Sequence, residues 1–333
     1  MTTVETPEPR QMTVIYSRAD KIFRGIVTSG ALTSLLLLGF IAAFLILRST
    51  ETFRQFGFGF ITGSEWFSAG EDPLGGAVAG AVEEVDKSVF SIGPMIVGSM
   101  VVALIAMVFA MPLSIGGALY IEFYAPRSIH RILVTLLDLA AAIPSLIFGL
   151  WGIQIFTSIG VRWATLLNDR LSFLPIFSVE FENFGRSPFV AGCVLAALVV
   201  PITTSVSREV YSRTPRDLVD ACFALGGTKW GGIRSVVIPY GKSGVIAGAM
   251  LGLGRALGET VAIYLMLNLV FKYSFQILDS AGGNVASMIA LKFGEATDKE
   301  ISALIASGLV LFIITLIVNM VASSIVARST PRA

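Results

Sequence analysis

Six long apolar runs, separated by polar segments, organise the chain. Charge-poor apolar runs of about 18 residues or more are typical of transmembrane helices, because about 20 helical residues cross the hydrocarbon core of a bilayer. The pattern therefore predicts an all-α, polytopic membrane protein with six transmembrane helices. Pro112 and Pro144 fall within the second and third runs, where we expect kinks or broken helices. The six runs cover residues 25–47, 94–119, 132–155, 189–207, 243–269 and 301–326.

The composition supports this class. Mean hydropathy is +0.79 and only 14% of the 333 residues are charged, a balance that a soluble core of this size does not show. The first run is too long for a removed signal peptide and lacks the small-residue cleavage pattern, so we interpret it as an anchor. Cys193 and Cys222 fall in a predicted span and a predicted loop, and we do not expect them to pair.

Several kinds of chemistry have no signal in the sequence. There is no metal-ligand cluster, no nucleophile motif and no phosphate-binding glycine loop with its lysine. The single histidine, His130, stands beside Arg131 in a short loop and is interpreted as a surface residue. We therefore expect a non-catalytic subunit with no metal and no cofactor of its own.

The runs also predict the domain organisation. Residues 1–24 form a polar tail, residues 25–327 the transmembrane domain and residues 328–333 a second tail. Loops on the inner side of a membrane carry an excess of Lys and Arg. With both termini inside, the inner segments hold fourteen basic residues and the outer segments nine, which predicts cytoplasmic termini.

The outer loop, residues 48–90, is too long for a simple turn. Its aromatic part, FRQFGFGFITGSEWF (53–67), precedes a stretch with five acidic residues. This part could form a small cap, or its aromatic rings could lie at the level of the lipid headgroups. The acidic residues are Glu71, Asp72, Glu83, Glu84 and Asp86.

The inner loop, residues 208–242, holds six basic and three acidic side chains. Residues 220–225 favour a short helix, and Gly226 with Gly227 can end it at positive φ. A second short helix can begin at Thr228, a capping residue, and should stop before Pro239. The pattern predicts a protruding knob, although a solvated charged loop is also compatible with it.

The fifth run has two contrasting faces when it is placed on one continuous helix. Its small residues Gly244, Gly248, Gly252 and Ala256 share one face with the charged Arg255 and Glu259, and large apolar residues occupy the other. The small face allows close approach of another helix.

Both charges of this run lie within the predicted membrane span. An arginine near mid-bilayer costs about 2.5–3.5 kcal/mol, so Arg255 should face protein or water, and Glu259 one turn away could pair with it. Asp138, in the third run, is interpreted as a structural or snorkelling charge near the cytoplasmic edge, with a role in a pathway as the alternative.

The inner loop resembles the cytoplasmic motif of ABC-importer permeases. That motif is Glu-Ala-Ala, then Gly six positions after the acid, with an aliphatic residue ten and a proline thirteen positions after the Gly. Asp for Glu and Cys for the second Ala are the departures. The matching residues are Asp220, Ala221, Cys222, Gly226, Val236 and Pro239, with Ile238 before the proline.

Four further blocks extend the resemblance over most of the chain. They resemble the PstC-type permease of the phosphate-specific importer, in the binding-protein-dependent transport permease family; Asp138 departs from the Glu found in many relatives. The blocks are FGFGFITGSEW (56–66), SIGPMIVGSMVVALIAMVFAMPLSIGGALYIEFYAP (91–126), LLDLAAAIPSLIFGLWG (136–152) and LGLGRALGETVAIYLML (251–267).

The resemblance implies a type I ABC-importer permease fold in the cytoplasmic (inner) membrane. It also implies a coupling loop at residues 208–242 and four kinds of partner: membrane lipid, a homologous permease of the PstA type, a PstB-type ATPase dimer that binds the ATP, and an extracytoplasmic PstS-type phosphate-binding protein. No nucleic acid is expected.

The substrate hypothesis follows from the two charges. A guanidinium presents a donor fork suited to a phosphate oxyanion, and a nearby carboxylate can accept the proton that phosphate still carries. We therefore expect Arg255 and Glu259 to line the substrate pathway. A purely structural ion pair, a sulfate or molybdate importer, a proton-coupled secondary transporter and a non-transporting scaffold or sensor are the alternatives.

Overall fold

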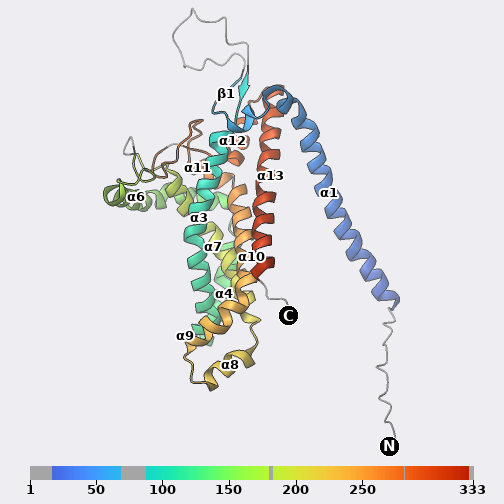
Figure 1. The fold of residues 1–333 in the computed structure, drawn as a ribbon, viewed down its shortest axis with the longest axis vertical. Coiled ribbons are helices and arrows are strands. Elements are labelled where there is room, and N and C mark those ends of the chain that lie inside the picture. The colour runs from blue at the N-terminus through green and yellow to red at the C-terminus, as the bar shows by residue number, and fades with distance from the viewer. Residues whose placement is uncertain (1–16, 69–87, 180–182, 281, 330–333) are drawn as a thin grey trace, which may run out of the picture. The chain divides into compact units, whose positions relative to one another are not determined.

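The computed structural model describes residues 17–68, 88–179, 183–280 and 282–329 (Figure 1). Within these ranges the chain is mostly helical, with one short two-stranded antiparallel sheet. The helices are α1 (Arg18–Phe56), α2 (Gly59–Thr62), α3 (Gly93–Leu119), η1 (Tyr120–Tyr124), α4 (Arg127–Ala142), α5 (Ser145–Trp151), η2 (Gly152–Phe156), α6 (Thr157–Leu171), α7 (Pro188–Ser212), α8 (Arg216–Ala224), α9 (Lys229–Gly232), η3 (Ile233–Val237), α10 (Ile238–Gly258), α11 (Val261–Met266), α12 (Val285–Lys292) and α13 (Asp298–Ser329), and the strands are β1 (Trp66–Phe67) and β2 (Val89–Phe90).

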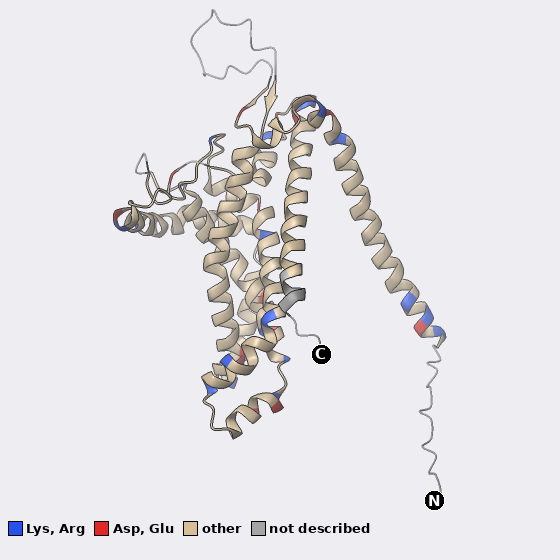
Figure 2. Cartoon of the chain, viewed as in Figure 1, with Lys and Arg blue, Asp and Glu red and all other residues tan. Residues whose placement is uncertain are grey.

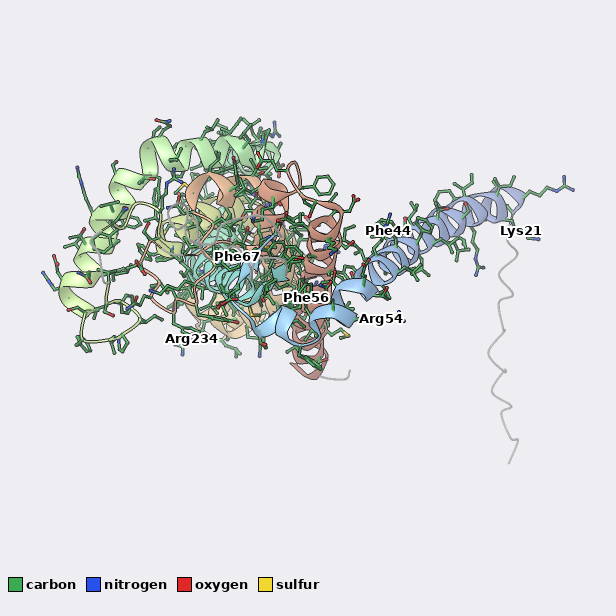
Figure 3. All side chains as sticks on the ribbon, turned by 90° about the horizontal axis from the view of Figure 1, so that it is seen from above. Lys21, Phe44, Arg54, Phe56, Phe67 and Arg234 are labelled. Carbon is green, nitrogen blue, oxygen red and sulfur yellow. The ribbon has the colours of Figure 1, made fainter. Side chains whose placement is uncertain are left out.

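The chain divides into two compact units, residues 1–47 and residues 48–333. The described part of the first unit is the leading portion of α1, which already begins at Arg18, inside the segment predicted as a tail. Its side chains, from Lys21 to Phe44, project on both sides of the helix (Figure 3). None of its most apolar window is buried, so an apolar surface is left along this helix.

Six segments of the described chain are long and apolar enough to cross a membrane, which confirms the predicted number. They are Arg18–Phe56, Gly93–Tyr124, Ser145–Leu171, Pro188–Ser212, Lys229–Gly258 and Asp298–Ser324. Lys, Arg, Asp and Glu gather mainly toward the two ends of the second unit, with few between them (Figure 2).

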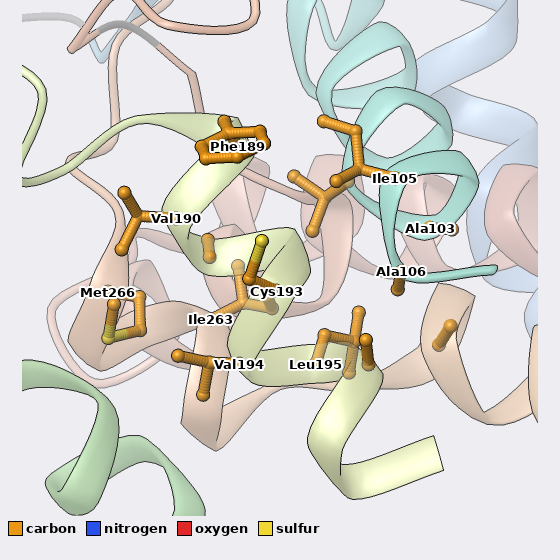
Figure 4. Close-up of a cluster of buried hydrophobic side chains, with 14 of the residues drawn as sticks. Ala103, Ile105, Ala106, Phe189, Val190, Cys193, Val194, Leu195, Ile263 and Met266 are labelled. Carbon is orange, nitrogen blue, oxygen red and sulfur yellow. The ribbon is translucent and has the colours of Figure 1, made fainter. Parts of the chain in front are cut away.

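Helix α7 is the centre of the second unit. In α7, 67% of the most apolar window is buried, whereas in the other five segments this share is at most 33%. Ile105 and Ala106 of α3 pack with Val194 of α7 and with Ile263 and Met266 of α11 (Figure 4). Side chains from α3, α7 and α11 therefore share one buried core within the second unit.

The third predicted run is divided. Helix α4 ends at Ala142, and α5 begins only after Pro144, whose predecessor Ile143 is extended. The residue before a proline is pushed out of helical geometry, so a break at this point is what the sequence predicts. Beyond η2, α6 runs across the direction of α3 and α10 (Figures 1 and 3), in a stretch between the third and fourth predicted runs. At Pro112, by contrast, α3 continues through the proline.

Part of the outer loop forms a cap at one end of the second unit. Strands β1 and β2 pair antiparallel, with Trp66 opposite Phe90, and both rings are buried together with Phe60. The described aromatic part therefore favours the cap over rings at headgroup level, although Phe58 is 86% exposed. The five acidic residues lie outside the described ranges.

A buried carboxylate fastens this cap to the last two helices. Glu300, 5% exposed, accepts hydrogen bonds from Trp66 Nε1 at 2.7 Å and from Ser68 Oγ at 2.9 Å. Lys292 Nζ lies 3.5 Å from the same carboxylate, which pairs the buried charge. The cap is thus bonded to α12 and α13.

Candidate functional site

The knob at the end opposite the cap consists of α8, α9 and the turn between them. Gly226 has φ of +83°, and its N–H donates to Phe223 O at 2.9 Å, while Gly227 N–H donates to Cys222 O at 3.0 Å. Nothing lies within 4 Å of a Cβ built on Gly226, so its positive φ rather than crowding requires glycine. Thr228 then caps α9 by accepting from Gly231 N–H at 3.1 Å.

The small residue at position 222 has a structural reason. Cys222 Sγ would lie 2.6 Å from a Cβ at Gly227 and 3.9 Å from one at Gly232, and it lies 3.9 Å from Ser235 Oγ. A larger side chain would therefore push α8 away from α9. Cysteine meets the same requirement as alanine at this position.

The outer face of the knob exposes both polar and large apolar side chains. Asp220 and Ala221 are exposed on α8. Leu225 is 90% exposed and Trp230 is 54% exposed, with Leu218 and Phe223 also exposed. Several large apolar side chains grouped on a protruding polar element are typical of a surface that binds another protein.

The base of the knob is anchored in the second unit. Ile233 and Val237 are buried with Tyr211 of α7 and Leu119 of α3. Lys229 Nζ lies 4.7 Å from the centroid of the Tyr124 ring, a cation–π contact with η1. Movement of the knob would therefore reach the ends of α3 and α7 directly.

The prediction that the second knob helix stops before Pro239 is wrong. Helix α9 continues through η3 into α10, and Ile238 N–H donates to Ile233 O in the wider π-helical register. That extra residue allows the chain to remain helical past a proline that has no N–H to donate. Val236 and Ile238 are half-buried, and Pro239 is exposed.

The small face of α10 lies against α7. A Cβ on Gly248 would lie 3.0 Å from Val206 Cγ1, and one on Gly252 would lie 2.6 Å from Thr203 Cγ2. Gly244 meets Val210 in the same way, and Ala256 is buried. The two helices approach closely because these four positions carry almost no side chain.

The fifth predicted run is not one helix. Helix α10 ends at Gly258, Glu259 is extended with ψ of 123°, and α11 begins at Val261. Glu259 Oε1 accepts from Ala262 N–H at 3.3 Å, so the carboxylate caps α11, and Asn284 Nδ2 donates to Glu259 O at 2.6 Å. We call this interruption, residues 258–260, the helix break.

The break changes the predicted relation of the two charges. Arg255 is exposed in the last turn of α10, whereas Glu259 is 7% exposed beyond the helix end. No ion pair joins them among the described residues, so the predicted pairing one turn apart on a single helix is wrong. A helical wheel assumes one continuous helix and so could not show the separation of Arg255 from Glu259, because a long-range hydrogen bond from Asn284 holds the break.

Asn284 is a residue that the sequence reasoning missed. Besides bonding Glu259, it caps α12 by accepting from Ser287 N–H at 2.7 Å. Its position before an apolar stretch is typical of a helix cap, but nothing local indicates a partner 25 residues away. Asp138 is exposed on α4, about one turn before that helix ends at Ala142, and no ion pair joins it to Arg255 among the described residues.

Comparison with known proteins gives a consistent result. Residues 110–333 match the family described as binding-protein-dependent transport system inner membrane component. The chain is 34% identical over 311 residues to the phosphate transport system permease protein PstC 2 of Mycobacterium bovis, covering 92% of each chain, and 34% identical over 327 residues to PstC of Xylella fastidiosa, covering 97% of this chain and 95% of the relative.

Two solved structures share the fold. A bacterial ABC transporter involved in the import of alginate matches with a TM-score of 0.51 and 14% identity, over 92% of this chain and 99% of that one. An inward-facing methionine ABC transporter matches with a TM-score of 0.51 and 12% identity, over 71% and 94%. At these identities the likeness concerns the fold alone.

Proposed function

This chain belongs to the family of inner membrane components of binding-protein-dependent transport systems, and from that premise we propose that it is the permease subunit that moves inorganic phosphate in an ATP-driven importer. The proposal rests most directly on Arg255, an exposed guanidinium beside a helix break in a mainly apolar span. An arginine at that depth must face water or protein. Its donor fork fits a phosphate oxyanion.

The helix break supplies polar backbone next to this arginine. Gly258 and Glu259 leave the helical ladder, and irregular backbone at membrane depth is tolerated where it lines a cavity. We propose that Glu259 serves the pathway by holding α11 at the break, with acceptance of a proton from phosphate as its second role. Relatives named as phosphate permeases support phosphate as the substrate.

The knob is the proposed contact with the ATPase. Asp220, Ala221 and the exposed apolar side chains of α8 would enter a groove of an ATPase subunit, and Gly226 would allow the turn that presents them. The buried residues at the base of the knob, Ile233 and Val237, would transmit closure of the ATPase to α3 and α7. ATP would bind to the partner subunits only.

The remaining partners follow from the same proposal. A homologous permease of the PstA type would complete the pathway, two PstB-type ATPase subunits would bind from the cytoplasm, and a PstS-type binding protein would deliver phosphate to the cap. Both termini and the knob would then lie on the cytoplasmic side.

The test is reconstitution of the complete importer in lipid vesicles. We expect phosphate uptake that requires ATP and the binding protein and that excess sulfate or molybdate does not inhibit. Arg255→Ala should reduce this uptake by about a hundredfold, the effect of losing two charge-assisted bonds, with assembly intact. Uptake without ATPase subunits, preferred transport of sulfate, or full activity of Arg255→Ala would each contradict the proposal.

A further inference from the structure

A second arginine lies beside a cavity on the cap side of the helix break. Arg186 directly precedes the N-cap of α7, and its Nη1 donates to Asn268 Oδ1 at 2.8 Å. Both residues line a cavity of about 300 Å³ together with Tyr264 and Leu291. That volume is several times the roughly 30 Å³ that one water molecule occupies in the liquid.

This cavity adjoins a smaller one that leads toward the break. The second cavity, of about 170 Å³, is lined by Thr260, Val261 and Ala290, and it shares Tyr264 and Leu291 with the first. Thr260 is the last residue of the break. Thr260 and Tyr264 line the second cavity, and Tyr264 and Asn268 line the first, so a row of polar residues runs from the end of α10 to Arg186.

The packing of α10 on α7 gives the distance between the two arginines along the axes of these helices. Gly248 lies against Val206, and Gly252 lies between Val199 and Thr203, so the two helices run antiparallel and Arg255 is near the level of residue 198. Arg186 precedes residue 198 by 12 residues, so it lies toward the N-terminal end of α7. At 1.5 Å per residue the separation is roughly 15–20 Å, away from the knob.

The chemistry of the lining favours an anion. Neither cavity has an Asp or Glu among its lining residues in the described chain. A guanidinium has five N–H donors, and the hydrogen bond to Asn268 uses one of those of Arg186. By comparison, the cavity beside the knob is lined by Arg208 and Arg213 but also by Glu209. The Glu209 carboxylate lies 2.8 Å from Arg213 and already pairs its charge.

We propose that Arg186, oriented by Asn268, is a second oxyanion-binding residue that receives phosphate on the cap side and passes it along the Thr260–Tyr264 row to Arg255. This inference rests on the proposed function. Two weak sites in series allow an ion to enter and to leave, whereas one tight site would hold it. Arg186 is thus a binding residue, and Asn268 is a positioning residue.

The experiment uses the complete reconstituted importer with Arg186→Ala, and with Arg162→Ala as the matched control. Arg162 is an exposed arginine of α6 that lines neither cavity. Arg186→Ala should lower ATP-driven phosphate uptake about tenfold, the effect of one charge-assisted bond, while assembly and stimulation of the ATPase by loaded binding protein remain normal. Arg186→Lys should restore part of the uptake, and Asn268→Ala should show a smaller loss.

The outcomes separate this inference from the proposed function. If the unmodified importer does not move phosphate, the proposed function fails. If it does, and Arg186→Ala transports as well as Arg162→Ala, this inference alone is wrong. A parallel loss of uptake, assembly and ATPase activity in Arg186→Ala would show that the Arg186–Asn268 bond only fastens two segments, and would also overturn it.

A second readout does not depend on transport. Leu291→Cys, on a Cys222→Ser background, places a thiol on the wall shared by both cavities, while the native Cys193 is buried. An anionic thiol reagent should react faster than a cationic one of the same size, and Arg186→Ala should remove that preference. An unchanged ratio of the two rates in Arg186→Ala would contradict the proposal.

Discussion

Two helices of this chain are followed by a change of backbone direction at or near a glycine, and the two places are held in different ways. At the knob, α8 ends at Ala224 and Gly226 follows with φ of +83°, and the N–H groups of Gly226 and Gly227 close the turn by donating to the carbonyls of Phe223 and Cys222, within five residues. At the helix break, α10 ends at Gly258, and the bond that holds the next residue comes from Asn284 on α12. The knob is a local structure, whereas the break depends on the packing of a separate helix.

This difference indicates how each region can move. A locally bonded turn keeps its shape when the elements around it shift, so the knob can transmit a displacement as a rigid body. The break is held by contacts between separate elements, and two arrangements of such contacts can differ by only a few kcal/mol. It is the place in the span where a change of conformation would be concentrated.

Among changes that test the difference between the knob and the helix break, Gly226→Val should have the largest effect. A β-branched residue in the left-handed region is strained by about 1–3 kcal/mol, so the turn should open and the knob should lose its shape. We expect at least tenfold weaker recovery of ATPase subunits in co-purification, with the helical content of the membrane domain unchanged. Gly116→Ala, in open space at ordinary φ, is the control, and an equal effect of both changes would count against the knob as the docking element.

Asn284→Ala should have the next largest effect, and it should act on the break rather than on the knob. The change removes the donor to Glu259 O and leaves that buried carbonyl without its 2.6 Å bond, which costs about 1–3 kcal/mol. Hydrogen exchange at residues 258–262 should accelerate, while exchange in the knob stays the same.

Asn284 also caps α12, so a control for the cap is needed. Ser287→Ala removes the other half of the capping box without a bond to Glu259. If both variants accelerate exchange at the break equally, the cap of α12 rather than the Asn284–Glu259 bond holds it.

The smallest effect should come from Lys229→Met at the base of the knob. The change keeps a long apolar stem and removes the ammonium group over Tyr124, which contributes about 0.5–1 kcal/mol at an exposed site. Thermal unfolding of the purified subunit should shift by only a few degrees, and ATPase binding should persist. A complete loss of binding would show that the knob depends on this contact and is less self-contained than its turn suggests.

Local signals predicted the regions that are held locally. Six apolar runs indicated six spans, Thr228 was recognised as a cap, Gly226 as a turn, and the small face of α10 as a surface for another helix. Each of these features is a pattern of residues within one continuous segment of the chain. The interruption of the third run at Pro144 was likewise predicted from a local signal, the proline itself.

Regions held by distant residues were not predicted. A hydropathy run continues through residues 258–260, because the Gly-Glu-Thr sequence there gives only a weak turn signal beside so many apolar neighbours. The bonds from Asn284 to Glu259 and from Arg186 to Asn268 join segments 25 and 82 residues apart, and one sequence contains no sign of such pairs. The continuation of the helix past Pro239 depended on a π-helical register that periodicity does not show.

Helix α12 joins the cap to the break, and this has a mechanical consequence. Asn284 at its beginning bonds the backbone of Glu259, while Lys292 at its end meets the carboxylate of Glu300 that also binds Trp66. Eight residues of helix form a strut about 12 Å long. A force applied to the β1–β2 sheet by a docking protein would therefore either break one of these two end contacts or be transmitted to the helix break between α10 and α11.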